Sequence, residues 1–317
     1  MGKGKIFFIA PKFAGYENEL IEAMQNNGYE VDFFPEKLHG KVSLFINKIN
    51  KKLYEKLQKN YLKKILESTK DKSYDFLFVI RGELLSEVFL ETLYKQTNIK
   101  RRINYQWDSV KRNQILLKTK YLYDKVYSFD KKDCDEYNFS YKPLFFIEKY
   151  KKKSDISYDL LFIGTEHGER IKYINRYKTI CKENNLKFKI ILYTSYLSYF
   201  KNKIFSDTFN QITLSDVIFK KISIKESYNF ISSSKVVLDV ANLHQTGLTM
   251  RTVETIGSHR KLITNNEYIK FDNFFNDKNI YDIDKEVDID FFQSKFTETN
   301  IDKLEINEWV NEFFKAV

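Results

Sequence analysis

Short apolar runs alternate with amphipathic helical stretches along the chain, and this alternation limits the possible folds more than any other feature. The runs are rich in Val, Ile and Phe, as is typical of strands buried on both faces of a parallel sheet. In the first half, strands are expected at residues 5–9, 29–34, 75–80, 102–107, 125–129 and 142–146. Helices are expected between them, at residues 17–27, 38–68, 86–96 and 109–121. The pattern predicts an α/β fold with a doubly wound parallel sheet.

A polar, basic stretch at residues 148–157 interrupts the alternation, which then starts again. Further strands are expected at residues 158–164, 188–193, 235–240, 262–264 and 279–283. Helices are expected at residues 169–184 and 303–314, and the capping-box pattern Ser223-Ile224-Lys225-Glu226 opens another. We therefore predict two domains, at residues 1–150 and 151–317.

The segment at residues 239–257 combines a strand end, a polar turn and a helix start. The turn contains Gly247, and the helix is predicted to start near Thr249, with Met250, Val253 and Ile256 facing a core. A helix that begins directly after a strand presents free N–H groups and the positive end of its dipole to the turn. The segment is therefore a candidate anion site.

Arg251 and Glu254 lie three residues apart and share one face of this helix. An arginine one turn into the helix can bind a diphosphate with two hydrogen bonds. The glutamate can accept hydrogen bonds from two ribose hydroxyls, so the pair suits a nucleotide-sugar. The alternative is an ion pair on a surface helix, which adds only about 0.2–0.5 kcal/mol of stability.

The same segment resembles the donor-site helix of GT-B glycosyltransferases. In these proteins a Gly precedes Arg-x-x-Glu, and a small residue and a strand such as Lys261-Leu262-Ile263-Thr264-Asn265 follow. More narrowly, the chain resembles bacterial capsule and lipopolysaccharide biosynthesis glycosyltransferases related to the CgeB-like group, over residues 74–264. The other segments that carry the likeness are Tyr105-Gln106-Trp107-Asp108-Ser109, Val126-Tyr127-Ser128-Phe129-Asp130, Pro143-Leu144-Phe145-Phe146 and Asp159-Leu160-Leu161-Phe162-Ile163-Gly164-Thr165.

The resemblance implies two Rossmann-like doubly wound domains with a cleft between them, the acceptor bound by the first and the donor by the second. It also implies that the last helix packs back on the first domain. The donor-binding residues are then Gly164, Thr165, His167, Arg170, His244, Gln245, Thr246, Gly247, Leu248, Thr249, Arg251 and Glu254. From the residues alone, the segment at 163–170 is equally an ordinary strand–helix turn, and Arg170 is equally a solvated helix residue.

Two acids that follow strands of the first domain are candidates for the general base of an inverting transferase. Glu83 follows the strand at 75–80 and Asp108 the strand at 102–107, and in open α/β sheets the carboxyl ends of strands face the ligand crevice. Asp108 is equally an N-cap for a helix starting at Ser109, and Glu83 an exposed loop acid. Trp107 either stacks on a sugar or belongs to the core.

The chain has 53 Lys and Arg against 43 Asp and Glu, and the net charge of +10 permits binding to nucleic acid, anionic lipid or phosphorylated small molecules. No RNA- or DNA-recognition motif is present, so no nucleic-acid partner is expected. No metal is expected, because the 4 His are scattered and the pairs Asp282-x-Asp284 and Asp288-x-Asp290 lie in an acidic surface run. We expect no cofactor and a metal-independent reaction, in which Arg251 and the helix N-terminus hold the leaving diphosphate.

The predicted helix at residues 38–68 carries lysines beside an apolar stripe. The lysines are Lys48, Lys51, Lys52, Lys56, Lys59, Lys63 and Lys64, and the stripe is Ile46, Ile49, Leu53, Leu57, Tyr61 and Ile65. Such a helix either makes weak contact with an anionic membrane or packs on the core with a solvated lysine face. No apolar run approaches the roughly 20 residues of a membrane span, and two lone cysteines suit a reducing compartment. We expect a cytoplasmic protein, peripheral on the inner face of the cell membrane.

The predicted function is transfer of a sugar from a nucleotide-sugar donor to a glycan or lipid-linked glycan acceptor in capsule or lipopolysaccharide biosynthesis. One alternative keeps the GT-B fold with other chemistry, as a nucleotide-sugar epimerase or another group transferase. Another is a non-catalytic, basic nucleic-acid binder. Tight binding of one free nucleoside diphosphate would favour the enzyme, and salt-dependent binding to generic DNA or RNA would favour the binder.

Overall fold

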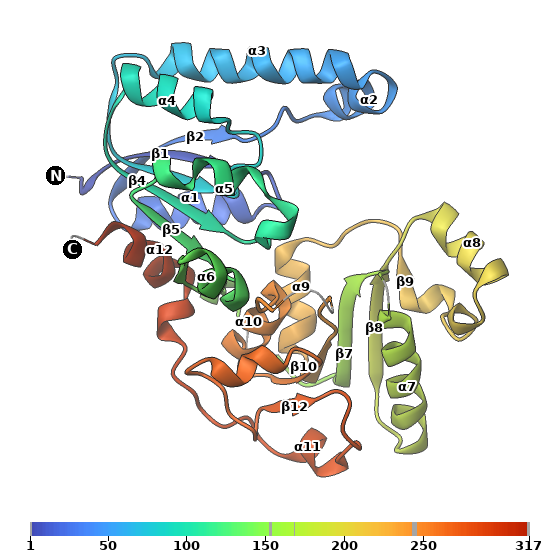
Figure 1. Cartoon of the computed structure of the whole chain (residues 1–317). Helices are drawn as coiled ribbons and strands as arrows, with labels where there is room; N and C mark the ends of the chain where they lie inside the picture. The colour runs from blue at the N-terminus through green and yellow to red at the C-terminus, as the bar shows by residue number, and fades with distance from the viewer. Residues whose placement is uncertain (1, 152–153, 168, 243–245, 316–317) are drawn as a thin grey trace. The chain divides into compact units, whose positions relative to one another are not determined.

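The computed structural model describes residues 2–151, 154–167, 169–242 and 246–315, and the chain divides into two compact units (Figure 1). The first unit contains the chain up to Pro143 together with the last helix, and the second contains Leu144–Glu305. The predicted boundary lay later, after residue 150. The units part earlier because the apolar run after Pro143 belongs to the second core, where the amide of Ile147 donates to the hydroxyl of Tyr228 at 2.7 Å.

Six parallel strands form the sheet of the first unit, in the order β2-β1-β3-β4-β5-β6. They are β1 Gly4–Ala10, β2 Tyr29–Pro35, β3 Ser73–Ile80, β4 Asn98–Gln106, β5 Lys125–Ser128 and β6 Ser140–Tyr141. The chain moves from β1 to β2 on one side and then to β3 on the other, so the sheet is doubly wound with its switch between β1 and β3. The predicted fold class is confirmed for this unit.

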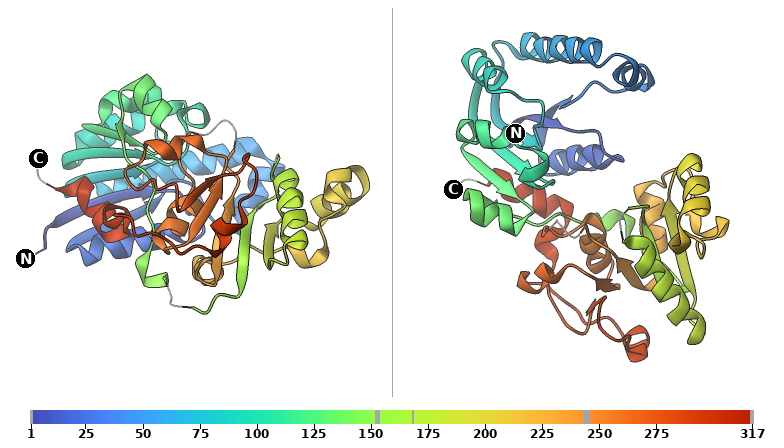
Figure 2. Two further views of the ribbon diagram at one scale, coloured as in Figure 1. Left: turned by 90° about the horizontal axis from the view of Figure 1, so that it is seen from below. Right: turned by 45° about the vertical axis from the view of Figure 1, so that its right-hand side comes forward.

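Side chains alternate between the two faces of this sheet, and helices cover both faces (Figure 1). Phe7 and Leu77 face the side covered by α3 (Lys51–Thr69) and α4 (Glu87–Gln96). Phe78 faces the other side, where its ring lies 4.8 Å from that of Phe313 in α12 (Ile306–Phe314). Helix α12 lies beside α1 (Tyr16–Asn26), as Figure 1 and Figure 2 both show. The chain therefore returns to its first unit to complete that core.

The predicted long helix at residues 38–68 is in fact two helices, α2 (Lys41–Ile49) and α3. Asn50 separates them with non-helical backbone angles, and its side-chain oxygen accepts a hydrogen bond from the amide of Leu53 at 3.0 Å. Asparagine is among the strongest N-cap residues, which explains the break. The helix expected at 109–121 is likewise reduced to α5 (Ile115–Thr119) between two short 3-10 turns.

The predicted strand at residues 142–146 is wrong. Only Ser140–Tyr141 pairs with β5, and the last ladder bond runs from the amide of Lys142 to the carbonyl of Ser128. Pro143 has no N–H with which to continue the ladder. The helix α6 (Lys131–Tyr137), which lies before this strand, was not predicted.

The second unit repeats the doubly wound plan, with six parallel strands in the order β12-β11-β10-β7-β8-β9. They are β7 Tyr158–Thr165, β8 Phe188–Tyr193, β9 Val217–Ile218, β10 Ser234–Asp239, β11 Lys261–Thr264 and β12 Ile280–Asp282. The helices are α7 Arg170–Glu183, α8 Tyr196–Phe205, α9 Ile224–Ser232, α10 Met250–Gly257 and α11 Ile289–Gln293. The capping box predicted at Ser223 and Glu226 is confirmed, because both of its reciprocal hydrogen bonds form.

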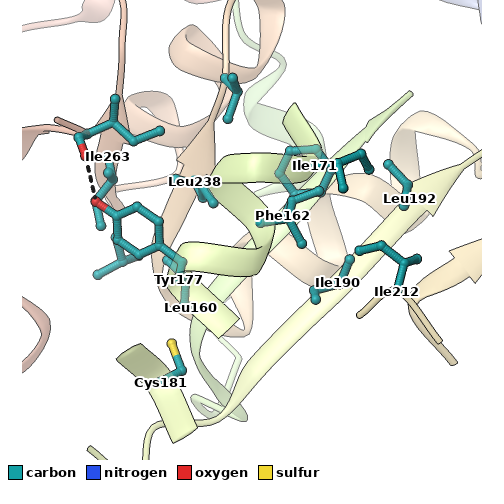
Figure 3. Packing of buried hydrophobic residues seen from close by; sticks show 14 of the residues in the cluster. Leu160, Phe162, Ile171, Tyr177, Cys181, Ile190, Leu192, Ile212, Leu238 and Ile263 are labelled. Atoms are coloured by element: carbon teal, nitrogen blue, oxygen red, sulfur yellow. Dashed lines mark hydrogen bonds between the residues drawn. The ribbon is translucent and has the colours of Figure 1, made fainter. Parts of the chain in front are cut away.

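The main core of the second unit lies between the sheet and α7. Leu160, Phe162 and Leu238 of the strands pack there with residues of α7 such as Ile171 and Tyr177 (Figure 3). A smaller cluster on the opposite face brings Leu161, Ile191 and Val237 against Ile231 of α9. Burial on both faces explains why β7 and β10 are continuous apolar runs rather than alternating ones.

Candidate functional site

The switch point of the second sheet lies between β7 and β10. These two strands are parallel neighbours with Leu238 opposite Phe162, so their carboxyl ends meet at one edge. The chain then leaves β7 towards β8 and leaves β10 towards β11, in opposite directions. In open α/β sheets the crevice at such a point binds ligands. The turn that follows β10, singled out from the sequence, therefore lies where a ligand site is expected.

Asp239, the last residue of β10, fixes the start of α10. Its Oδ2 accepts hydrogen bonds from the hydroxyls of Thr249 at 2.6 Å and Thr252 at 2.7 Å. Thr249 is the N-cap and accepts from the amide of Thr252 at 3.1 Å. A carboxylate at the positive end of a helix is stabilised by the helix dipole. The predicted helix start is confirmed, while the hydroxyl of Thr249 is occupied by Asp239.

Arg251 and Glu254 are paired inside the second unit. Nη1 of Arg251 donates to Oε2 of Glu254 at 2.8 Å and to the hydroxyl of Ser227 in α9 at 2.6 Å. The Glu254 side chain is 1% exposed and that of Arg251 18%, so this is not the surface ion pair of the alternative interpretation. Within the described part of the chain, the buried Nε of Arg251 has no hydrogen-bond partner. The guanidinium thus keeps unused donor capacity beside the switch point.

Arg170 joins the two strand ends. Its Nε donates to the carbonyl of Val240 and its Nη1 to the carbonyl of Thr165, both at 2.9 Å. Burial lowers the pKa of Arg170, and the charge of Asp239 opposes this effect. The side chain is therefore not the solvated helix residue of one sequence interpretation. It holds the loops that leave β7 and β10 together.

The remaining donor-side candidates divide into exposed, buried and undescribed residues. Thr165 and His167 are exposed, and Leu248 is buried in the core. A Cβ on Gly164 would lie 2.8 Å from the ring of Phe162, so any larger residue there would displace that buried ring. His244 and Gln245 lie outside the described residues.

Two asparagines that the sequence analysis did not single out shape the turn after β10. Asn265 pairs with the backbone of Ala241, accepting from its N–H at 2.8 Å and donating to its carbonyl at 3.2 Å. Nδ2 of Asn266 donates to the carbonyls of Thr246 at 3.3 Å and Gly247 at 3.2 Å. Both follow β11, and two amides directly after a buried strand were the available signal. They position the turn through its backbone.

A pocket of about 440 Å³ opens at the carboxyl ends of β10, β11 and β12. Its lining includes Asn242, Asn265, Tyr268, Phe275, Asp282 and Asp284. Asp284 is exposed, as the sequence analysis expected, and it accepts a hydrogen bond from the hydroxyl of Tyr173 at 2.9 Å. In the described ranges, no group of three or more His, Cys, Asp or Glu is placed to hold a metal ion.

The first unit carries a charged cluster at the carboxyl edge of β3 and β4. Arg81 directly follows β3 with a left-handed backbone (φ 70°), and its carbonyl accepts from Gln106 at 2.6 Å and Asn113 at 2.8 Å. Glu83 pairs with Arg81 and with Lys37, whose Nζ lies 2.8 Å away. Two cations therefore occupy the Glu83 carboxylate, and a substrate hydroxyl would have to compete with them for it.

Asp108 is less tightly paired than Glu83. Its nearest cations are Nε of Arg81 at 3.6 Å and Nη1 of Arg112 at 3.8 Å. Burial raises the pKa of Asp108, and the charges of these two arginines oppose the rise. The N-cap alternative fails, because the 3-10 turn begins at Val110, whose amide donates to Asp133 at 2.6 Å. Asp108 is thus the better-placed candidate base.

Glu36 belongs to the same cluster and was missed in the sequence analysis. It follows β2, and its Oε1 accepts from the amide of Leu84 at 3.1 Å. The carboxyl is fully buried, its Oε2 has no partner among the described residues, and burial raises its pKa to about 7. Its position directly after a strand was the only sequence signal for a role of Glu36. The loop that it supports follows β3, a different strand, so this contact could not be read from the sequence.

Trp107 is partly buried. Its exposure therefore lies between that of a core residue and that of a surface ring free to stack on a sugar, the two roles considered from the sequence. Its ring lies 6.0 Å from that of Phe13 in the loop after β1, and Phe13 is 51% exposed. The aromatic pair therefore stands at the carboxyl edge of the same sheet.

The lysines of α3 are all exposed, whereas Ile65 near its end is buried in the core with Tyr61 packed beside it. The core-packing alternative thus holds for the second half of the helix. At the junction with α2 the apolar residues face solvent: Phe45 is 63% exposed, Ile49 68% and Leu53 42%. No helix in the part of the chain that the structure covers is long and apolar enough to cross a membrane.

Comparison with known proteins establishes the fold. The sequence matches no protein-family model and no curated protein. The structure resembles an α-glucosyltransferase in complex with UDP and a 13-mer DNA with an A:G mismatch (14% identity, 88% of this chain and 81% of that chain, TM-score 0.56). It also resembles the UDP-GlcNAc 2-epimerase of Methanocaldococcus jannaschii in complex with UDP-GlcNAc and UDP (12% identity, 98% of this chain and 99% of that chain, TM-score 0.55). A third similar structure is the lipopolysaccharide outer core galactosyltransferase WaaB (13% identity, 98% of this chain and 91% of that chain, TM-score 0.51). The chain has the GT-B fold that the sequence predicted.

Proposed function

We propose that the protein is a glycosyltransferase that moves a sugar from a nucleoside diphosphate donor to a glycan or lipid-linked glycan acceptor of cell-surface polysaccharide synthesis. The observation that carries the proposal is the Arg251–Glu254 pair on α10, at the switch point of the second sheet. The similar structures support it, since they include a UDP complex and sugar transferases. The narrower likeness to capsule and lipopolysaccharide enzymes rests on the sequence segments alone.

The donor site is proposed at the N-terminus of α10. Arg251 would turn from Glu254 to the diphosphate, and Glu254 would then accept from the ribose hydroxyls. This breaks the ion pair between Arg251 and Glu254. The loss is compensated because a diphosphate carries more negative charge than one carboxylate. Thr165, His167, Thr246 and Gly247 would line the rest of the site, with Asp108 as base for the acceptor in the first unit.

The proposal is tested by thermal shift with UDP, GDP, CDP, dTDP, ADP and CMP, and with the matching nucleosides. One nucleoside diphosphate should stabilise the protein most. Arg251→Ala should weaken its binding at least tenfold while affecting the nucleoside less, and Glu254→Ala should weaken both. Arg260→Ala is the matched control, because Arg260 donates to the carbonyl of Ser232 at the opposite edge of the sheet. Equal, negligible losses in folded Arg251 and Glu254 variants would refute the donor site.

The reaction is proposed to need no divalent metal. The support is the cationic Arg251 and the helix N-terminus, which can stabilise the charge that develops on a leaving diphosphate. Transfer measured in EDTA should stay within a few-fold of transfer with magnesium. Complete loss that manganese restores would overturn this part of the proposal.

Weak contact of the first unit with anionic membrane is proposed through the lysines from Lys48 to Lys64. Each can contribute about 1 kcal/mol near a negative surface, and salt screens the attraction. Replacement of Lys52, Lys56, Lys59 and Lys63 by Gln should abolish low-salt co-sedimentation through this helix. If a lipid-linked acceptor is used, activity on it should fall while activity on a soluble acceptor persists.

A further inference from the structure

Helix α8 presents an apolar face that no other described part of the second unit covers. Leu197 is 82% exposed, Phe200 60% and Ile204 73%, and their spacing places all three on one side of the helix. Tyr196 and Phe205 extend the face at either end and are 64% and 79% exposed. Five large exposed side chains on one helix are far more than the scattered apolar residues of an ordinary surface.

The opposite side of α8 is firmly attached to the second unit. Tyr199 is buried and packs against Phe209, with ring centroids 5.7 Å apart. Ser198 donates to Glu166 at 3.0 Å, and Asn202 also bonds to Glu166. These contacts fix the orientation of α8, which is drawn in yellow in Figure 2. Its apolar face is therefore kept exposed.

Most charges beside this face are positive, and the exposed Asp207, just after α8, is the exception. The sequence of α8 contains Lys201 and Lys203 and no acid. The loop that packs on it continues the pattern: Phe219 stacks on Tyr196 with centroids 3.8 Å apart, and Lys220 and Lys221 after it are exposed. Apolar and aromatic side chains bordered by lysines are the composition of a helix that lies in the interface of an anionic membrane.

A second copy of the chain is a poorer partner for the same face. In a two-fold dimer the patch would meet itself, so the lysines of one copy would oppose the lysines of the other. Like charges across an interface cost binding free energy. Anionic lipid headgroups complement the same lysines, and acyl chains accept the apolar face.

We infer that α8 is a membrane-docking helix of the second unit, which inserts Leu197, Phe200 and Ile204 at the surface of an anionic bilayer. This inference does not require the proposed glycosyl transfer. It rests on α8 alone and is separate from the electrostatic contact proposed for the first unit.

Docking would also reach the candidate donor site. Glu166 directly follows β7 and holds Thr194, Ser198 and Asn202, so the loop at the switch point is bonded to α8. A bilayer that fixes α8 would therefore fix this loop as well.

The test is co-sedimentation of the full chain with vesicles of phosphatidylglycerol and phosphatidylcholine, and with phosphatidylcholine alone. The variant L197S/F200S/I204S should bind the anionic vesicles at least tenfold more weakly than the parent. The control V88S/F271S replaces exposed apolar residues that lie outside α8 and should bind as the parent does. Circular dichroism and the melting temperature establish that each variant is folded.

Salt separates the two membrane contacts. Binding through α8 should persist in part at high salt, because apolar insertion is not screened, whereas binding through the α3 lysines should vanish. Unchanged vesicle binding of the folded triple variant at both salt concentrations would overturn the inference. So would a concentration-dependent dimer of the parent that the triple variant abolishes without any change in vesicle binding. Neither outcome bears on nucleoside diphosphate binding, which is measured without vesicles.

Discussion

The guanidinium of Arg170 donates to the carbonyl of Val240, and this bond ties the start of α7 to the end of β10. A second bond to the carbonyl of Thr165 extends the tie to β7. One side chain thus spans the two strands between which the sheet reverses its winding. The width of the candidate donor site depends on it.

Arg170→Met should weaken nucleoside diphosphate binding while the protein stays folded. The substitution keeps apolar bulk but leaves the buried carbonyl of Val240 unpaired, at a cost of about 1–3 kcal/mol. The matched control is Lys178→Met on the same helix, since Lys178 donates to the carbonyl of Gln211 and to Asp216 just before β9. Both variants should melt at lower temperature, but only Arg170→Met should lose affinity. If the two variants bound the nucleoside diphosphate equally well, Arg170 would have no specific role in the donor site.

Asp108→Asn should lower the turnover number roughly 10²- to 10⁴-fold and leave donor affinity unchanged, since a general base acts in the chemical step. Glu83→Gln should cost far less, because Lys37 and Arg81 already occupy that carboxylate. A base must be ionised, so activity should fall with decreasing pH at a value above the usual aspartate range, as the raised pKa of Asp108 requires. The reverse ranking of the two variants would assign the base to Glu83.

Glu36→Gln should stabilise the protein above neutral pH. Burial raises the native pKa of Glu36 to about 7, so the native state binds the proton more tightly than the unfolded chain does. The resulting stability is complete below the unfolded pKa near 4.5 and is lost as pH rises towards 7; it amounts to roughly 3 kcal/mol at most. Melting temperatures from pH 4.5 to 8 should fall less steeply in the variant. The exposed Glu91→Gln should follow the parent, and identical slopes in all three would exclude Glu36 as the source.

Gly257→Ala should destabilise the second unit by about 1–3 kcal/mol, because the new Cβ would clash with the side chain of Phe146. Phe146→Ala should remove part of that clash, because it deletes the Cγ and Cδ2 atoms that the new Cβ would meet. A double-mutant cycle with thermal unfolding should therefore show Gly257→Ala costing less in the Phe146→Ala background. Additive effects would mean that the helix end relaxes away from the ring.

Strand and helix positions could be predicted largely from hydrophobic periodicity, since burial on both sheet faces leaves a strong local signal. The exceptions are local as well: Pro143 stops a ladder, and Asn50 caps a helix. The spacing of Arg251 and Glu254 placed them on one face, but it did not reveal that the pair is buried against Ser227 of another helix. The support that Glu36 gives to the backbone of Leu84 was also out of reach, because it joins loops after different strands.

The division of the chain between the two units decides which hydrophobic core can be completed first during synthesis. The second unit is inserted into the first, because the chain leaves the first sheet after Pro143 and returns to it only at Ile306. On the ribosome, every strand of the first sheet emerges early, yet Phe78 and Tyr105 stay without the rings of α12 that cover them. The second unit can close its core while the part of the nascent chain made earlier still exposes an apolar face to solvent. A holding chaperone would therefore meet this protein at its N-terminal half, and release would wait for the last helix.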